Sequence, residues 1–186
     1  MRSQSRTVIN SLWLASAIAL LLFSQLAGAS DVAVKQRYNT QGSIGNITLG
    51  MKLSALKAQD SSRLRPVTGV LGEVKTSYQY TFPGGHAVII GIGLDGVISE
   101  IRITDPYFLT EKGIHVGDVF SKVRAAYPDY VCNHGNGYLV LVNYEINRAF
   151  EFGTDGLSNQ WLDSQSHDCS MANTQKLIYI GISTPR

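Results

Sequence analysis

A twelve-residue segment occurs twice in this chain, and equivalent positions of the two copies are 67 residues apart. Residues 47–58 are ITLGMKLSALKA and residues 114–125 are IHVGDVFSKVRA. Glycine, serine and the final alanine are identical in the two copies, and the apolar and basic positions match in type. An internal repeat at a fixed offset indicates that one supersecondary unit occurs twice. We therefore predict a first unit at 43–110 and a second unit at 111–186.

Each copy predicts a short strand, a tight turn and a short helix. Alternating apolar residues end the strand, the glycine permits a turn with positive φ, and apolar and basic residues then recur at helical spacing. In the second copy, Asp118 is predicted to be the helix N-cap, and Pro128 limits the helix to about two turns. The strand ends are Ile47 and Leu49 in the first copy and Ile114 and Val116 in the second.

Alternating segments after each helix predict antiparallel strands. The predicted strands are 77–82, 87–94 and 97–103 in the first unit, and 138–144, 149–152 and 177–182 in the second. In the first of these, Tyr78, Tyr80 and Phe82 share one face, which is expected to pack in the core. The fold class that follows is α+β, with two tandem units of strand, helix and antiparallel meander. Helices on one sheet face leave the other face free.

This layout resembles that of the secreted β-lactamase-inhibitor proteins (BLIP-like). A single copy of the unit is similar to the small BamE-type lipoproteins of outer-membrane assembly. The residues that carry the resemblance are 50–58 and 117–125, where a glycine is followed by a helix with the pattern G-x-x-φ-S-x-φ. The resemblance implies a fold and a tendency to bind proteins, but it transfers no contact residue of an inhibitor. The chain departs from both families, because it has one pair of cysteines and no cysteine for a lipid anchor.

Residues 1–29 have the three parts of a secretory signal peptide. Arg2 and Arg6 form a basic start, residues 12–23 are apolar, and Ala27-Gly28-Ala29 supplies the small residues of a cleavage site. The apolar run is shorter than the roughly 20 residues of a membrane span. We expect an exported periplasmic or secreted protein with no stable membrane anchor after cleavage. Residues 30–42 are polar and are expected to form a flexible arm.

The charge balance argues against nucleic acid as a partner. The full chain has 16 basic and 14 acidic residues, and the predicted signal peptide contains two of the basic ones, so the remaining chain has 14 of each. Without a basic run, a protein releases few counterions from DNA or RNA.

Cys132 and Cys169 are the two cysteines of the chain. In an exported protein an even number favours a disulfide. The bridge would close a loop of about 38 residues and contribute on the order of 4 kcal/mol. A reactive thiol in the sequence His167-Asp168-Cys169 is the alternative, and it requires Cys132 to stay unpaired.

Motifs of known enzyme classes are absent from the sequence, including G-x-S-x-G, H-E-x-x-H and the phosphate-binding loop. The four histidines lack the spacing of metal ligands, so neither a metal nor a cofactor is expected. His134, His167 and Asp168 would be the ligands of a zinc site if the disulfide brought them together. A catalytic triad defined by geometry alone is not visible in a sequence. We expect a protein that is not an enzyme.

Tyrosine is the strongest remaining signal, with nine in the chain. Tyrosine is favoured in binding surfaces, because it brings a large contact area at a low entropic cost. The candidate binding residues are Tyr138, Tyr144, Tyr179, His86 in its Pro-Gly-Gly-His loop, and Trp161.

The expected function is that of a protein-binding module, most concretely an inhibitor or immunity-type protein. It would block a hydrolase of the cell envelope by steric occlusion. A soluble envelope-assembly or stress factor is the second hypothesis, and a hydrolase with an unrecognised site is the third.

Overall fold

The computed structural model describes residues 42–68, 76–164 and 167–184. The predicted signal peptide at 1–29, and the predicted arm apart from Gly42, lie outside these residues. Within the described ranges, none of the helices is both long and apolar enough to cross a membrane.

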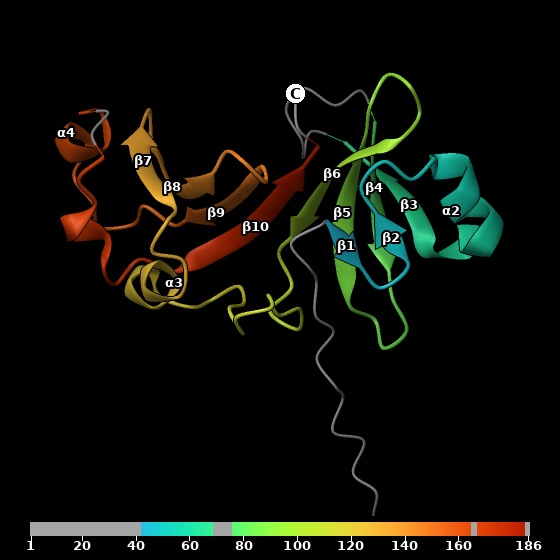
Figure 1. Cartoon of the computed structure of the whole chain (residues 1–186), viewed down its shortest axis with the longest axis horizontal. Helices are drawn as coiled ribbons and strands as arrows, with labels where there is room; N and C mark the ends of the chain where they lie inside the picture. Colours follow the sequence, from blue (N-terminus) through green and yellow to red (C-terminus); the bar gives the residue numbers. More distant parts are fainter. Residues whose placement is uncertain (1–41, 69–75, 165–166, 185–186) are drawn as a thin grey trace, which may run out of the picture. The chain divides into compact units, whose positions relative to one another are not determined.

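Ten strands and a few short helices make up the described chain (Figure 1). The first elements are β1 (Ser43–Ile44), β2 (Ile47–Thr48), α2 (Leu53–Asp60), the 3-10 turn η2 (Ser61–Arg63), β3 (Leu64–Val67), β4 (Thr76–Thr81), β5 (Ala87–Ile92) and β6 (Ile98–Ile103). The later ones are α3 (Phe120–Ala126), β7 (Val131–Gly135), β8 (Tyr138–Asn143), β9 (Arg148–Phe152), α4 (Asn159–Leu162), the 3-10 turn η3 (Ser170–Ala172) and β10 (Leu177–Ser183).

Eight of the strands form one antiparallel sheet in the order β3-β4-β5-β6-β10-β9-β8-β7. The predicted α+β class with antiparallel meanders is thereby confirmed. Strands β6 and β10 pair at the middle of the sheet (Figure 1). Each is the innermost strand of a four-strand meander, β3 to β6 on one side and β7 to β10 on the other. Strands β3 and β7 are the two edges. Strands β1 and β2 form a separate two-stranded hairpin.

The cross-strand register divides the side chains of the large sheet into two faces. Paired residues of neighbouring strands point to the same side of a sheet. One face, the covered face, carries most of the buried residues of the strands: Tyr80, Val88, Ile90, Ile101, Ile103, Ile180, Ile182, Arg148, Phe150, Leu141 and Cys132. The opposite face, the open face, contains a row that crosses all eight strands: Arg65, Gln79, Ile89, Arg102, Gly181, Ala149, Val142 and Val131.

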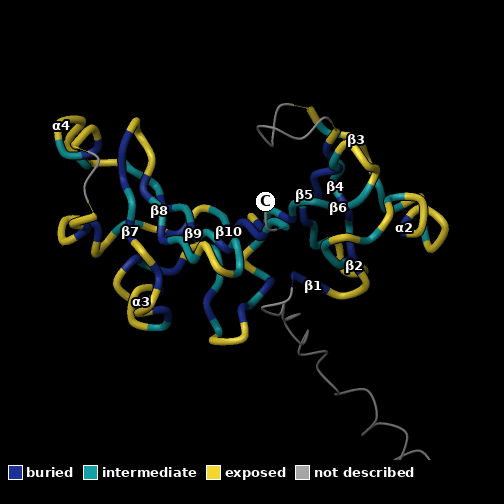
Figure 2. Tube along the Cα trace, turned by 45° about the horizontal axis from the view of Figure 1, so that its top comes forward, coloured by how far each residue is buried: buried dark blue, intermediate teal, exposed yellow. Residues whose placement is uncertain are grey.

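The helices contact the covered face. The Lys57 Nζ of α2 lies 5.2 Å from the ring centre of Tyr78, and the Phe120 ring of α3 lies 5.0 Å from that of Phe152. Tyr80 and Phe82 are buried, as predicted, and Tyr78 is half-buried beside them. Figure 2 shows exposed residues gathered on helices and turns, whereas most strand residues are buried or intermediate.

The segments that lead into α2 and α3 make matching backbone contacts. Gly50 has φ +81° and Gly117 has φ +97°, so the predicted positive-φ turn is confirmed in both. Each glycine donates its N–H to the last strand of its half of the sheet. Gly50 donates to Ile98 O and Gly117 donates to Leu177 O, each at a distance of 2.8 Å. Two further pairs of bonds repeat the pattern. Leu53 N–H donates to Gly96 O as Phe120 N–H donates to Gln175 O. Ile98 N–H donates to Met51 O as Leu177 N–H donates to Asp118 O.

Two local predictions are wrong in the second half. Ile114 and Val116 do not form a strand. The Thr110 N–H donates to Ile114 O at 2.8 Å, but this bond closes the tight turn around Gly113. Asp118 is not the N-cap of α3, since Val119 occupies that position without a side-chain cap. The Asp118 carboxylate instead accepts from the His115 N–H at 3.0 Å and from Lys122 Nζ at 2.6 Å.

Candidate functional site

Three of the predicted binding residues, Tyr138, Tyr144 and Tyr179, lie on or beside the open face. Alternation along β8 places Tyr138 on the same side as Val140 and Val142. Tyr179 pairs with Glu151, which pairs with Val140, so this tyrosine shares the same side. Tyr138 is 42% exposed and Tyr144 is 66% exposed, and both rings are therefore available for contact.

Tyr144 extends this surface toward the edge strand β7. Its hydroxyl accepts a hydrogen bond from Asn133 Nδ2 at 2.9 Å, which ties the turn after β8 to β7. Val131, the first residue of β7, is 42% exposed. We call the combined surface the β7–β10 face; it consists of Val131, Asn133, Tyr138, Val140, Val142, Tyr144, Ala149, Glu151 and Tyr179.

A polar cluster lies beside these apolar residues, where β6, β10 and β9 meet. The Arg102 Cζ lies 4.1 Å from the ring centre of Tyr179, which is within cation–π distance. The Tyr179 hydroxyl donates to Glu151 Oε2. Burial and the neighbouring Glu151 carboxylate raise the pKa of Tyr179 above its ordinary value of 10.0, so the phenol stays protonated at neutral pH.

The other two predicted residues lie elsewhere in the fold. The His86 ring stacks on Tyr107 with 3.6 Å between ring centres, and its Nδ1 lies 3.0 Å from Asp105 Oδ2. The Trp161 ring of α4 stacks on His134, with 3.9 Å between ring centres. His134 shares the covered face with Cys132, so Trp161 is on the side of the sheet away from the tyrosines. The structure thus places three of the five on or beside one face of the sheet.

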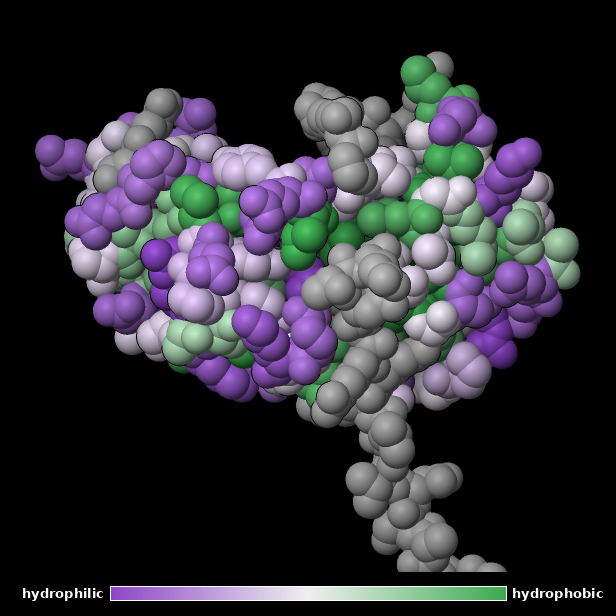
Figure 3. Space-filling model, in the orientation of Figure 1, coloured by the Kyte–Doolittle hydropathy of each residue, from purple (hydrophilic) through white to green (hydrophobic). Residues whose placement is uncertain are grey.

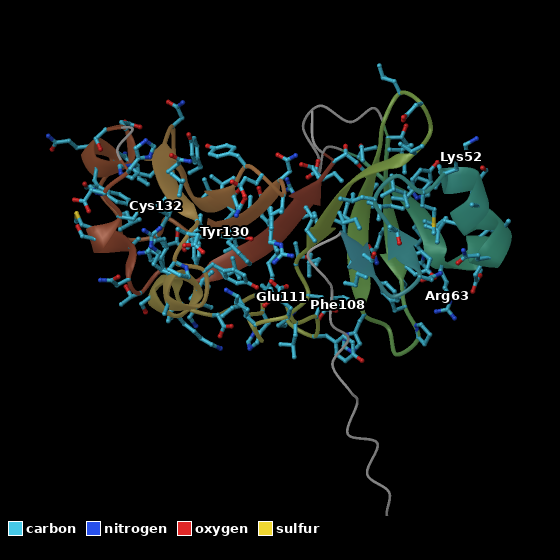
Figure 4. All side chains as sticks on the ribbon, viewed as in Figure 1. Lys52, Arg63, Phe108, Glu111, Tyr130 and Cys132 are labelled. Atoms are coloured by element: carbon cyan, nitrogen blue, oxygen red, sulfur yellow. A yellow bond between two sulfur atoms is a disulfide. The ribbon has the colours of Figure 1, made fainter. Side chains whose placement is uncertain are left out.

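The predicted disulfide between Cys132 and Cys169 is confirmed, and neither cysteine is free (Figure 4). This pairing rules out the reactive thiol at Cys169. His167 Nδ1 donates to the main-chain oxygen of Cys132 at 2.9 Å. The disulfide and this bond both fasten the segment after α4 to the edge strand β7. Among the described residues, no group of three or more His, Cys, Asp or Glu is placed to hold a metal ion.

A second polar cluster lies on the covered face around Arg148, which is fully buried. Its Nη1 donates to both oxygens of Glu111, at 2.9 and 3.2 Å, and Tyr127 donates to the same carboxylate at 3.0 Å. Burial raises the pKa of Glu111, but its own backbone hydrogen bond and the Arg148 guanidinium outweigh that effect and hold it below 4.5. Because the guanidinium is inaccessible, this cluster has a structural role.

Sequence reasoning missed Glu100 and Arg102, the β6 residues next to the tyrosine surface. Both alternate with buried isoleucines along β6, and that alternation was the signal for a charged pair on the free side. On the side that Figure 3 shows, hydrophobic residues reach the surface over β8 and between β10 and β6, flanked by hydrophilic ones.

Comparison with known proteins identifies a similar fold. The crystal structure of the uncharacterized protein YfeY from Escherichia coli matches with a TM-score of 0.56 and 20% sequence identity. The match covers 80% of this chain and 99% of that chain. No protein-family model and no curated protein matches the sequence.

Proposed function

We propose that this protein is an exported protein-binding module that acts through its β7–β10 face. The observation that carries the proposal is that Tyr138, Tyr144 and Tyr179 lie on or beside the same face of an antiparallel sheet. Tyrosines with a large exposed area are enriched among residues that dominate binding energy. Exposed valine and tyrosine side chains there provide apolar area, and the neighbouring polar groups provide specificity.

The most concrete form of the proposal is an inhibitor or immunity-type protein for an envelope hydrolase. It would occlude the partner's active site by steric contact, with no covalent step. A disulfide is typical of proteins outside the cytoplasm, which supports an envelope location for this protein. The proposal includes cleavage of the signal peptide after Ala29 and release of the remaining chain into the periplasm.

The proposed architecture behind this surface is a pair of tandem units of the BLIP-like type. The matched contacts of Gly50 with Ile98 and of Gly117 with Leu177 support it, because the two glycines of the repeat donate equivalent bonds to the last strand of their own half of the sheet. Duplication would give the sheet two meanders. Tyr138, Tyr144 and Tyr179 all belong to the second one.

A capture experiment tests the proposed function. The protein, immobilised, is incubated with an envelope extract, and bound proteins are identified by mass spectrometry. We expect a specific hydrolase to be retained, and the Tyr138→Ala/Tyr144→Ala double variant to bind it at least roughly tenfold more weakly. Leu94→Ala is the matched control, because Leu94 is 79% exposed in the turn between β5 and β6.

Two results contradict the proposal. Equal retention by the double variant would place binding outside the β7–β10 face. Retention of outer-membrane assembly components in place of a hydrolase would favour the envelope-assembly hypothesis.

A further inference from the structure

The centre of the open face holds a row of charged and aromatic side chains from three neighbouring strands. Glu100 and Arg102 come from β6, Tyr179 from β10 and Glu151 from β9. Arg102 Nη2 lies 3.9 Å from Glu100 Oε1, its Cζ lies over the Tyr179 ring, and Tyr179 donates to Glu151. The four side chains therefore form one connected row, which we call the Glu–Arg–Tyr–Glu row.

Gly181 lies beside the row at the centre of the sheet. Gly181 pairs with Arg102 on one side and with Ala149 on the other. A Cβ atom at position 181 would lie 3.6 Å from Tyr179 Cε2, so the ring lies alongside the space that a side chain would occupy. The tyrosine thus lies between Arg102 and Glu151 and contacts both.

The row has one more carboxylate than it has basic groups, whereas the other residues of the β7–β10 face are uncharged. Two carboxylates, Glu100 and Glu151, face a single guanidinium, and Arg102 is already engaged by Glu100 and by the Tyr179 ring. The remaining residues of the β7–β10 face are valine, tyrosine, alanine and asparagine. Burial beneath a partner would leave one carboxylate without a compensating cation, and an uncompensated buried charge is strongly unfavourable. Burial also raises the pKa of Glu100, while the charge of Arg102 opposes that effect.

We infer that the β7–β10 face recognises a surface loop of a partner protein that presents an arginine or lysine flanked by apolar side chains. The basic side chain would lie beside Glu151, with Glu100 as the second carboxylate. The flanking apolar groups would contact Tyr138, Tyr144 and the exposed Val131. This inference rests on the proposed function, and it specifies the chemistry of the partner at the same surface.

A phage-displayed library of random twelve-residue peptides tests this inference with a defined probe. Peptides are selected on the immobilised wild-type protein after depletion on the Tyr138→Ala/Tyr144→Ala variant. We expect the enriched peptides to share an arginine or lysine between apolar residues. Their affinity should fall roughly tenfold or more in Glu151→Gln, and it should weaken as the salt concentration rises. Glu145→Gln is the matched control, because Glu145 is an exposed carboxylate in the turn after β8.

The outcomes separate the two proposals. Enriched peptides that need Tyr138 and Tyr144 but lack a common basic residue, or that bind Glu151→Gln as tightly as wild type, overturn the inference and leave the protein-binding surface intact. A selection in which no peptide prefers wild type over the tyrosine variant counts against both. Thermal unfolding of Glu151→Gln checks that a loss of binding does not come from a loss of folded protein.

Discussion

Replacing Cys132 by alanine is expected to lower the free energy of unfolding by about 2–5 kcal/mol. The bridge joins residues that are 37 positions apart, so it removes many conformations from the unfolded chain. It also fastens the segment after α4 to β7, an edge strand whose Cys132 oxygen is bonded to His167. Urea unfolding of the wild type and the variant, monitored by circular dichroism, measures the difference.

The double variant Cys132→Ala/Cys169→Ala is the control for this experiment. It should lose about as much stability as either single variant, since each one removes the same bond. In native protein that is alkylated without reduction, mass spectrometry should detect no label. Two labelled thiols would contradict the disulfide and restore the reactive thiol as a hypothesis.

Glu111→Gln is expected to cost about 3 kcal/mol of stability, because it leaves the fully buried Arg148 without its carboxylate. That figure is at the low end for buried pairs, since the Glu111 side chain is 33% exposed. In the double variant Arg148→Met/Glu111→Gln, much of the loss should be recovered, because no unpaired charge stays buried. Asp60→Asn is the surface control: its pair with Arg63 is partly exposed, so its removal should cost less than the loss of the Glu111 carboxylate.

The same pair predicts a dependence of stability on acidity. The folded-state pKa of Glu111 lies below its ordinary value of 4.5, so the pair's contribution is complete above pH 4.5 and is lost as the pH falls through the lower folded value. Wild type and Glu111→Gln should therefore converge in stability in acid. A constant difference from pH 7 to pH 2 would contradict this account.

Alternation along the chain predicted most of the strands. A period-two pattern, as at 77–82 and 138–144, indicates that the segment is a strand and which of its side chains share one face of the sheet. The facing of Tyr138 was not predicted; in the structure, alternation along β8 puts it on the side of Val140 and Val142. Strand β3 was missed because it is four residues long and includes Pro66, which cannot donate to a ladder and is tolerated at an edge. The strand predicted at Ile114 depends on a partner segment, and only one backbone pair forms there.

The candidate site was only partly predictable, because it depends on which strands become neighbours. Arg102 and Tyr179 are 77 positions apart in sequence, and their contact exists because β6 pairs with β10 in the middle of the sheet. No local pattern determines that pairing or its register. Residue type alone also did not separate the surface tyrosines from Trp161, whose ring is turned to the covered face by its stacking on His134.

Calorimetric titration of the captured partner, once purified, tests the central claim most directly. We predict a stoichiometry near one to one, no chemical change in either protein, and at least roughly tenfold weaker binding by Tyr138→Ala/Tyr144→Ala. Turnover of a substrate by this protein, lost by several orders of magnitude on a single histidine or serine substitution, would contradict the claim, as would binding that is unchanged in the double variant.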